Sequence, residues 1–202
     1  MATATRILDA ARGRLLADGY ANLSTRKVAE AAGVPLSQIH YHFGGRQGLV
    51  LALLDREDSL RVGRQRAMYA ASEPLSVRYD QACAFLDDDL EAGYVRVLQE
   101  MIAAGWSDDA VALRVLELLR GWIDLLEQVA REAEQRFGSL GPFGAGDLGL
   151  LVGMAFLGGE AIMLLGDDGW SGRVRGSLRR VGDLIRVLET APHPLPLGDA
   201  PA

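Results

Sequence analysis

The chain has 202 residues, of which 49% are hydrophobic and 24% are charged, and this composition is typical of a folded globular protein. Aromatic residues make up only 6%, and no segment alternates β-branched or aromatic residues with polar ones as a strand would. The single cysteine, Cys83, excludes an internal disulfide, and charged side chains within the first twenty residues argue against a signal peptide. We therefore expect an all-α cytoplasmic protein.

The net charge of −6 is distributed unevenly. Residues 1–50 carry a net charge of +3, whereas the remaining 152 residues carry −9. A basic head on an acidic body is typical of a protein that contacts nucleic acid at one end only. The imbalance is modest, and +3 over fifty residues also arises by chance.

Hydrophobic periodicity and terminating residues predict nine helices. Ser24 is suited to cap the second helix and Gly33 to end it, while Pro35 fits the first turn of the third. The predicted helices cover residues 4–16, 24–33, 35–43, 47–71, 76–91, 94–104, 108–137, 147–166 and 174–190. Four short helices followed by five longer ones suggest a small head on a larger helical body.

The segment from Leu23 to Leu54 carries the most informative pattern. Two short helices joined by a turn at Gly33 have the plan of a helix-turn-helix, in which the second helix enters the DNA major groove. Ile39 and Phe43, four residues apart, anchor the second of these helices inward. The remaining positions carry polar donors and few charges, which suits contact with base edges and phosphates.

The same segment closely resembles the tetracycline-repressor (TetR) family. The residues that carry the resemblance are Thr25-Arg26-Lys27-Val28-Ala29, Ala32-Gly33-Val34, Ile39-His40-Tyr41-His42-Phe43, Arg46 and Leu49. The resemblance covers about 45 residues. Beyond them, only the number and order of the helices match.

The resemblance implies a set of DNA-contacting residues, namely Thr25, Arg26, Leu36, Ser37, Gln38, His40, Tyr41, His42 and Arg46. Thr25, Tyr41, His42 and Arg46 match positions that contact the phosphate backbone, and the others match positions that face the groove. Arg26 is equally an ordinary surface charge, and His40 is either a base contact or a solvated side chain. Pro35, Ser37 and His40 depart from the family pattern, so the operator sequence does not follow from the resemblance.

We expect neither a metal nor a cofactor. His40 and His42 are two residues apart, so on a helix their side chains point about 200° apart and cannot share one ion. The chain also lacks a nucleophile–base pair and a phosphate-binding loop, which argues against an enzyme. A helical adaptor that binds only protein is the other rival hypothesis, and it would show no salt-dependent affinity for DNA.

The last two helices are the expected dimer interface. Glycines within a helix lower its stability unless another backbone approaches closely, and the last helix has apolar residues spaced as in a helical bundle. In the resembled family the last two helices pair with those of a second copy, although an intramolecular seam would show the same spacing. The predicted interface residues are Gly149, Gly153, Leu178, Val181, Ile185 and Leu188.

The resemblance also implies a small-molecule effector site among the body helices. The candidate lining residues are Phe85, Met101, Trp106, Trp122, Met154, Phe156 and Glu160. The aromatic and methionine side chains could equally be plain core. Glu160 could balance a cationic ligand, or it could pair with Arg179 or Arg180 or lie in the dimer seam. We expect a hydrophobic effector, because few polar side chains occupy these helices.

Residues Leu148 to Leu165 are apolar enough to raise the question of a membrane span. Glu160 and several glycines lie within them, so we expect a buried helix and no membrane partner. The predicted organisation is a helix-turn-helix DNA-binding domain at 1–46, an effector-binding and dimerisation domain at 47–191, and a flexible tail at 192–202. The predicted function is a transcriptional regulator, a repressor that binds a palindromic operator as a homodimer and is released by its effector.

Overall fold

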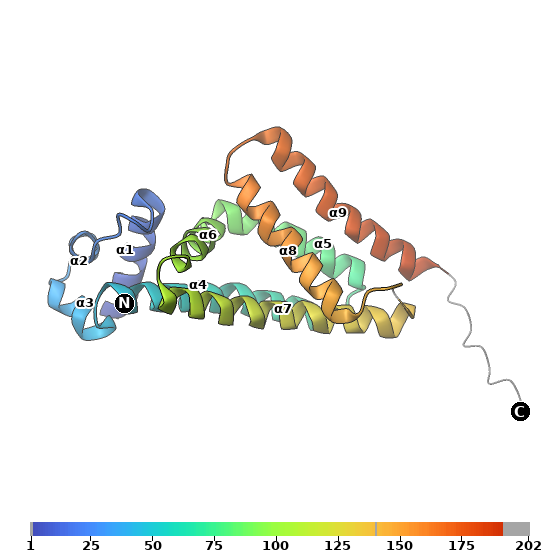
Figure 1. Cartoon of the computed structure of the whole chain (residues 1–202), viewed down its shortest axis with the longest axis horizontal. Coiled ribbons are helices and arrows are strands. Elements are labelled where there is room, and N and C mark those ends of the chain that lie inside the picture. The colour runs from blue at the N-terminus through green and yellow to red at the C-terminus, as the bar shows by residue number, and fades with distance from the viewer. Residues whose placement is uncertain (1, 140, 192–202) are drawn as a thin grey trace, which may run out of the picture. The chain divides into compact units, whose positions relative to one another are not determined.

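A computed structural model describes residues 2–139 and 141–191, and within these ranges the protein is all-helical with no strand (Figure 1). The helices are α1 (Thr3–Asp18), α2 (Thr25–Ala32), α3 (Leu36–Phe43), α4 (Arg46–Tyr69), α5 (Leu75–Glu91), α6 (Tyr94–Gly105), α7 (Asp109–Phe137), α8 (Ala145–Met163) and α9 (Asp168–Thr190). The predicted fold class is therefore confirmed. The predicted tail, 192–202, lies outside the described residues.

The predicted bounds of the last helix were wrong. Helix α9 begins at Asp168 rather than at residue 174, because Asp167 caps it by accepting a 2.7 Å hydrogen bond from the backbone N–H of Trp170. The preceding helix ends at Met163 rather than at residue 166, and Gly166 in the connecting turn has a φ of 78°. Aspartate is a favoured N-cap and glycine readily adopts positive φ, so this turn is encoded locally.

The chain divides into two compact units. Unit 1 comprises the residues up to Ala67 together with Leu86–Gly121, and unit 2 comprises Met68–Phe85 together with the residues from Trp122 onward. This division differs from the predicted domain limits of 1–46 and 47–191. The difference arises because the first part of α4 contributes four buried side chains to the core of the head, namely Leu49, Val50, Leu53 and Leu54.

The core of unit 1 is formed where α1, α2 and α3 pack together and against parts of α4, α6 and α7. Ile7, Val28 and Ile39 are fully buried, one from each of the three short helices. Leu36 and Phe43 pack against the same core from the two ends of α3. The helix-turn-helix is thus held by apolar contacts on one side, which leaves its other side exposed.

In unit 2, glycines let the helices cross closely. A methyl group on Gly149 would lie 2.8 Å from the backbone nitrogen of Glu127, and one on Gly153 would lie 2.3 Å from Cδ1 of Ile123. Helices α7 and α8 therefore meet backbone to backbone. The prediction that Gly149 and Gly153 face a second copy is wrong, because α7 of the same chain already occupies the space beside them.

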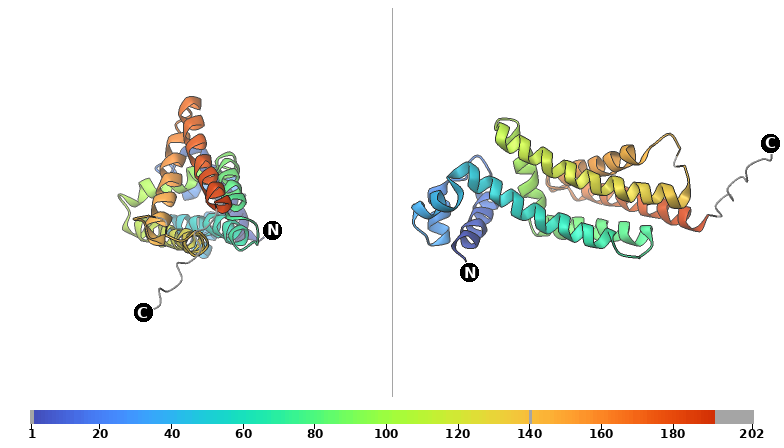
Figure 2. Two further views of the ribbon diagram at one scale, coloured as in Figure 1. Left: turned by 90° about the vertical axis from the view of Figure 1, so that its right-hand side faces the viewer. Right: turned by 90° about the horizontal axis from the view of Figure 1, so that it is seen from below.

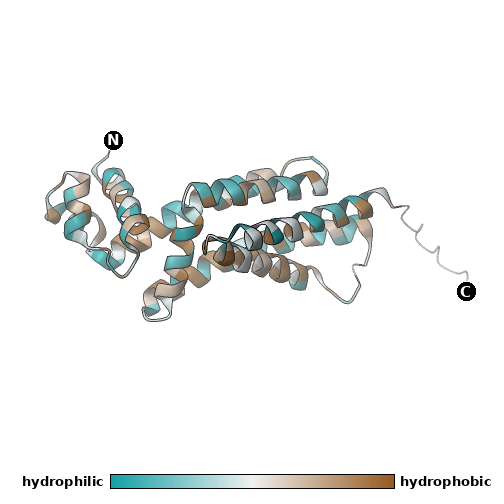
Figure 3. Ribbon diagram, turned by 90° about the horizontal axis from the view of Figure 1, so that it is seen from above, coloured by the Kyte–Doolittle hydropathy of each residue, from teal (hydrophilic) through white to brown (hydrophobic). Residues whose placement is uncertain are grey.

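Helices α8 and α9 pack against each other and are drawn in orange and red in both views of Figure 2. A methyl group on Gly159 would lie 2.7 Å from Cγ1 of Val174, so this contact is close as well. Helix α9, which leads to the grey end of the chain in Figure 3, carries both hydrophobic and hydrophilic residues.

Among the described residues, α8 is long and apolar enough to cross a membrane by length and composition alone. Glu160 lies within it and is completely buried. Gly149, Gly153 and Gly159 are also buried, against α7 and α9. These contacts support the interpretation of α8 as a helix of the protein body.

Candidate DNA interface and ligand pocket

The turn between α2 and α3 has the geometry expected of a helix-turn-helix. Gly33 adopts the left-handed conformation, with a φ of 62°, and its backbone N–H donates to the carbonyl of Glu30 at 3.0 Å. The backbone N–H of Val34 donates to the carbonyl of Ala29, also at 3.0 Å. Ser24 occupies the N-cap position of α2, as predicted, but its side chain forms no capping hydrogen bond.

The predicted DNA-contacting residues lie together on α2, on α3 and at the start of α4. Six of the nine are exposed: Arg26, Ser37, His40, Tyr41, His42 and Arg46. Thr25, Leu36 and Gln38 are half-buried. Tyr41 is 80% exposed although it is a large aromatic side chain, and its ring meets that of His42 edge to face. An exposed tyrosine at this position is available to a partner, and its contact with DNA stays a prediction.

Charge on this surface favours an anionic partner. Arg26 forms no ion pair with any residue in the described ranges, whereas Lys27 lies 3.7 Å from Asp18. Neither α2 nor α3 has an acidic residue in its first turn. The partial positive charge at each helix N-terminus is therefore not neutralised locally, which suits phosphate binding.

Arg46 has a structural role that sequence reasoning missed. Its Nε donates to the carbonyl of Leu23 at 3.0 Å, and its Nη2 donates to the carbonyl of Tyr20 at 2.8 Å. The guanidinium also lies 4.4 Å from the centroid of the Tyr20 ring. Arg46 thus ties the start of α4 to the loop that precedes α2. Its predicted phosphate contact remains a prediction, because a guanidinium that holds this loop also lies at the surface.

Within the part of the chain that the structure describes, no group of three or more histidine, cysteine or acidic side chains is placed to hold a metal ion. His40 and His42 are both exposed on α3. The surface formed by α2 and α3 therefore offers hydrogen-bond donors and positive charge to a partner.

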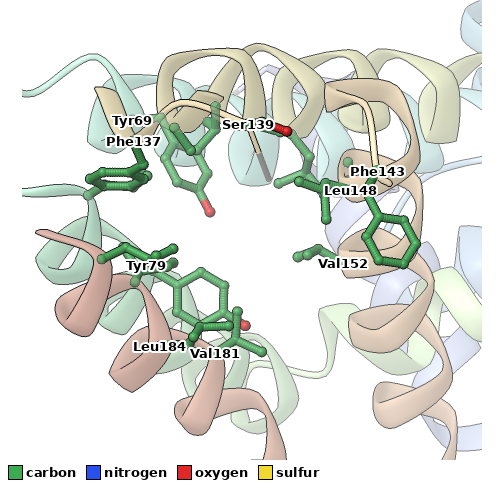
Figure 4. Close-up of a pocket in the computed structure, with 17 residues that line it drawn as sticks. Tyr69, Tyr79, Phe137, Ser139, Phe143, Leu148, Val152, Val181 and Leu184 are labelled. Atoms are coloured by element: carbon green, nitrogen blue, oxygen red, sulfur yellow. The ribbon is translucent and has the colours of Figure 1, made fainter. Parts of the chain in front are cut away.

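Unit 2 contains a pocket of about 550 Å³ (Figure 4). This volume lies within the usual range for small-molecule sites. Its walls come from the end of α4, from α5, from the second half of α7, from the segment before α8, and from α8 and α9. The lining residues are Tyr69, Leu75, Tyr79, Leu126, Val129, Ala130, Ala133, Phe137, Ser139, Phe143, Leu148, Gly149, Val152, Val181, Leu184, Ile185 and Leu188.

None of the seven residues predicted for the effector site lines this pocket. Met101 belongs to the core of unit 1, and Trp106 is 85% exposed, so neither is placed to line it. Trp122, Phe156 and Glu160 are buried, while Phe85 is half-buried and Met154 is 41% exposed. Phe156 contacts a lining residue, because its ring meets the ring of Tyr79 edge to face at 6.1 Å.

Four residues predicted for the dimer interface line the pocket instead: Gly149, Val181, Ile185 and Leu188. Leu178 is buried. The regularly spaced apolar residues of α9 therefore face other helices of the same chain. This is the intramolecular packing that the spacing also allowed. Large apolar residues of α8 and α9 that stay exposed are Leu150, Leu151, Met154, Ile162, Trp170, Leu184 and Val187.

An ion pair stabilises the wall of the pocket near Tyr69. Arg78 is 2% exposed, and it donates to the backbone carbonyl of Tyr69 and to both carboxylate oxygens of Glu132. This hydrogen bonding by Arg78 holds the pKa of Glu132 below its ordinary value. The buried arginine is thereby neutralised within unit 2, and it does not line the pocket.

Two tyrosines, Tyr69 and Tyr79, line the pocket. Burial raises the pKa of both Tyr69 and Tyr79 well above the ordinary value for a phenol, so both stay protonated at neutral pH. In Figure 4 the hydroxyl of Tyr69 points into the space between the lining residues. Sequence reasoning missed both tyrosines, because their positions on α4 and α5 follow no motif.

Known proteins resemble this chain in two ways, by its N-terminal sequence and by its fold. Residues 7–53 match the family model described as bacterial regulatory proteins, tetR family. YvkB of Bacillus subtilis, named as an uncharacterized HTH-type transcriptional regulator, is 44% identical over 59 residues. That match covers 29% of this chain and spans only 31% of the length of YvkB.

The likeness to solved structures extends over nearly the whole chain. A TetR transcription regulator from Haloarcula marismortui has a TM-score of 0.77 and 18% identity, and the match covers 90% of this chain and 97% of that one. A transcriptional regulator from Saccharomonospora viridis, solved in complex with choline, has a TM-score of 0.73 and 19% identity, with 93% and 95% covered. At these identities the likeness establishes the fold.

Proposed function

We propose that the chain is a transcriptional regulator of the tetR type, a cytoplasmic repressor that binds a palindromic DNA operator as a homodimer and is released by a small molecule bound in unit 2. Each part of this proposal depends on a different surface: the exposed side of α2 and α3, the apolar face of α8 and α9, and the pocket.

The exposed side of α3 is the observation that carries the proposal. Ser37, His40 and Tyr41 are exposed on it, and buried Ile39 fixes the helix from behind. An α-helix fits the major groove of B-DNA, where side-chain donors and acceptors distinguish all four base pairs. Gln38 is the residue on this helix best suited to read an adenine, because its amide can both donate and accept.

Dimerisation is supported by the exposed apolar side of the last two helices. Leu150, Leu151 and Met154 on α8, and Leu184 and Val187 on α9, are between 41% and 61% exposed. Large apolar side chains that stay exposed on two packed helices are a feature that protein–protein interfaces commonly show. A second copy of the chain would cover this surface and would also supply the second half-site contact that a palindromic operator requires.

Ligand release is supported by the pocket, which has the volume and the apolar lining of a small-molecule site. A regulator of the same fold holds choline, so this architecture can accommodate a small ligand. A ligand that binds the DNA-incompetent form more tightly by ~3 kcal/mol would weaken operator affinity by about 150-fold.

The test is direct measurement of DNA binding. Fragments that bind the purified protein would be selected from random duplexes, and the affinity for the selected sequence would be measured across a range of salt concentrations. We expect a palindromic consensus, and an affinity that falls steeply with salt because phosphate contacts release counterions. A protein that selects no sequence and shows no salt dependence would be a protein-binding adaptor instead.

A further inference from the structure

We infer that the pocket of unit 2 selects an uncharged ligand, a largely hydrocarbon molecule that carries one hydrogen-bonding oxygen, as a long-chain alcohol does. The role of this ligand as effector rests on the proposed function, but its chemical class follows from the pocket itself. Three features carry the inference: the absence of charge in the lining, the neutralised ion pair behind it, and the hydroxyl of Tyr69 that points into the pocket.

The lining offers nothing to balance a charged ligand. None of the 17 described residues that form it is acidic or basic, and 14 of them are glycine, alanine, leucine, isoleucine, valine or phenylalanine. A charge transferred from water into such a site loses its hydration and gains no partner, which costs several kcal/mol. A charged ligand would therefore bind weakly, whatever its shape.

The charged side chain that contacts the lining residue Tyr69 already has a partner of opposite charge. Arg78 donates to the carbonyl of Tyr69, yet the same guanidinium is bound by the carboxylate of Glu132. An anionic ligand would have to displace Glu132, and a cationic ligand would have to displace Arg78. Breaking a buried pair leaves one charge without compensation, which is strongly unfavourable.

The phenol of Tyr69 provides the polar contact that remains. Its hydroxyl points into the space between the lining residues (Figure 4), whereas the hydroxyl of Tyr79 is fully buried and interacts with the thiol of Cys83. A hydroxyl or carbonyl oxygen of a ligand would form a hydrogen bond with the Tyr69 hydroxyl. Ser139 is exposed and adds a second hydroxyl to the lining.

Aromatic rings alone do not favour a cation here. Tyr69, Tyr79, Phe137 and Phe143 line the pocket and could attract a quaternary ammonium group by cation–π contact. In Figure 4 Phe143 lies on the opposite side of the pocket from Tyr69, Tyr79 and Phe137. Without a carboxylate in the lining, this attraction has to offset the full loss of hydration of the cation. We therefore expect a preference that differs from that of the choline-bound neighbour.

Three probes with the same ten-carbon chain test the inference: decanol, decanoate and decyltrimethylammonium. Their dissociation constants for the full-length protein would be measured by calorimetry at neutral pH, below the concentrations at which they aggregate. We expect decanol to bind at least tenfold more tightly than either charged probe. Binding of a charged probe within tenfold of decanol, or failure of decanol to bind, would overturn the inference.

Variants that remove single hydroxyl groups locate the binding site. Tyr69→Phe should weaken decanol binding by about 3- to 10-fold, because it removes one hydrogen bond and keeps the ring. Tyr94→Phe is the matched control, since Tyr94 is a buried tyrosine of unit 1. Equal effects of the two changes would overturn the assignment. The DNA affinity of the ligand-free protein is measured in a separate experiment. A protein without DNA affinity would contradict the proposed regulator function but would leave the inferred ligand class intact.

Discussion

The guanidinium of Arg46 lies over the ring of Tyr20, 4.4 Å from its centroid, and donates a 2.8 Å hydrogen bond to the carbonyl oxygen of the same residue. One side chain at the start of α4 thus holds both the backbone and the side chain of the loop before α2. Because that loop leads into the helix-turn-helix, Arg46 contributes to the stability of the surface formed by α2 and α3 as well as to its charge.

Replacing Arg46 with alanine should lower both the stability of the protein and its affinity for DNA. The variant loses two hydrogen bonds to backbone carbonyls, at Leu23 and Tyr20, and we expect the free energy of unfolding to fall by roughly 1–2 kcal/mol. Urea unfolding would measure it. Arg26→Ala is the control, because Arg26 is exposed and unpaired in the described ranges. Equal stability of the two variants would contradict this role.

Gln38→Ala and Arg26→Ala should affect DNA binding in different ways. Loss of a base contact at Gln38 should relax the preference at one or two base pairs by roughly 1–3 kcal/mol. Loss of the charge at Arg26 should weaken binding to all sequences and reduce the salt slope by about one, because an exposed cation without an ion pair attracts phosphates of any sequence. Affinities for single-substitution operators at several salt concentrations would separate the two effects. A Gln38 variant with an unchanged sequence preference would exclude base reading by this residue.

Glu132→Gln should reduce the loss of stability in acid. The pKa of Glu132 is lowered in the folded protein, chiefly by hydrogen bonding from Arg78. Its contribution is therefore complete above the unfolded pKa, near 4.5, and is lost as the pH falls through the lower folded pKa. The variant should be less stable than the wild type at pH 7, by about 1–3 kcal/mol, and this difference should shrink towards pH 4. Urea unfolding of both proteins at pH 7 and pH 4 would measure the two free energies of unfolding. A difference between variant and wild type that does not change with pH would contradict the role of the ion pair.

Gly149→Ala should destabilise the protein, although alanine favours helix by up to about 1 kcal/mol over glycine. The added methyl group would lie 2.8 Å from the backbone nitrogen of Glu127, so α7 and α8 would have to separate, at a cost of about 1–3 kcal/mol. Gly121→Ala in α7 meets no atom within 4 Å and should be stabilising. Thermal unfolding of the two variants should therefore shift in opposite directions, and a common direction would refute the close crossing.

Leu151→Glu together with Val187→Glu should produce a monomer that remains folded. Both side chains are more than half exposed, so the changes do not disturb the core, but charges would oppose burial of the α8–α9 surface in a dimer. Light scattering would give the mass of the particle and circular dichroism its helix content. Leu113→Glu, at an exposed position of α7 in unit 1, should leave the oligomeric state unchanged. A wild-type monomer at micromolar concentration would rule out the dimer.

Local signals predicted the head well. Gly33 and Gly44 end α2 and α3 in left-handed conformations, as glycines placed after short helices are expected to do, and Ile39 is buried as its spacing required. These features depend on residues within a few positions of one another. Periodicity and end signals are sufficient in such a case.

The pocket could not be located in the same way. Val181 and Ile185 have the spacing of a helical seam, but that spacing does not reveal which partner fills the seam. Tyr69, Tyr79 and Phe137 come together from three helices far apart in the sequence, and no local pattern relates them. Trp106 was predicted to line the pocket because it is large and apolar, but its side chain is exposed. Residue type alone does not indicate the direction in which a side chain points.

Helix α9 presents pocket residues and exposed residues within a single turn. Val181, Leu184 and Ile185 line the pocket. Leu184 is nevertheless 58% exposed, and Val187, which does not line the pocket, is 61% exposed. A helix moves as a stiff rod, so a ligand that displaces Ile185 also displaces Val187. If a second copy covers that outer side, ligand affinity and subunit affinity become linked quantities, and each must change the other by the same factor. Titrations at different protein concentrations would then yield different apparent ligand affinities, a dilution effect that a closed, single-chain pocket would not show.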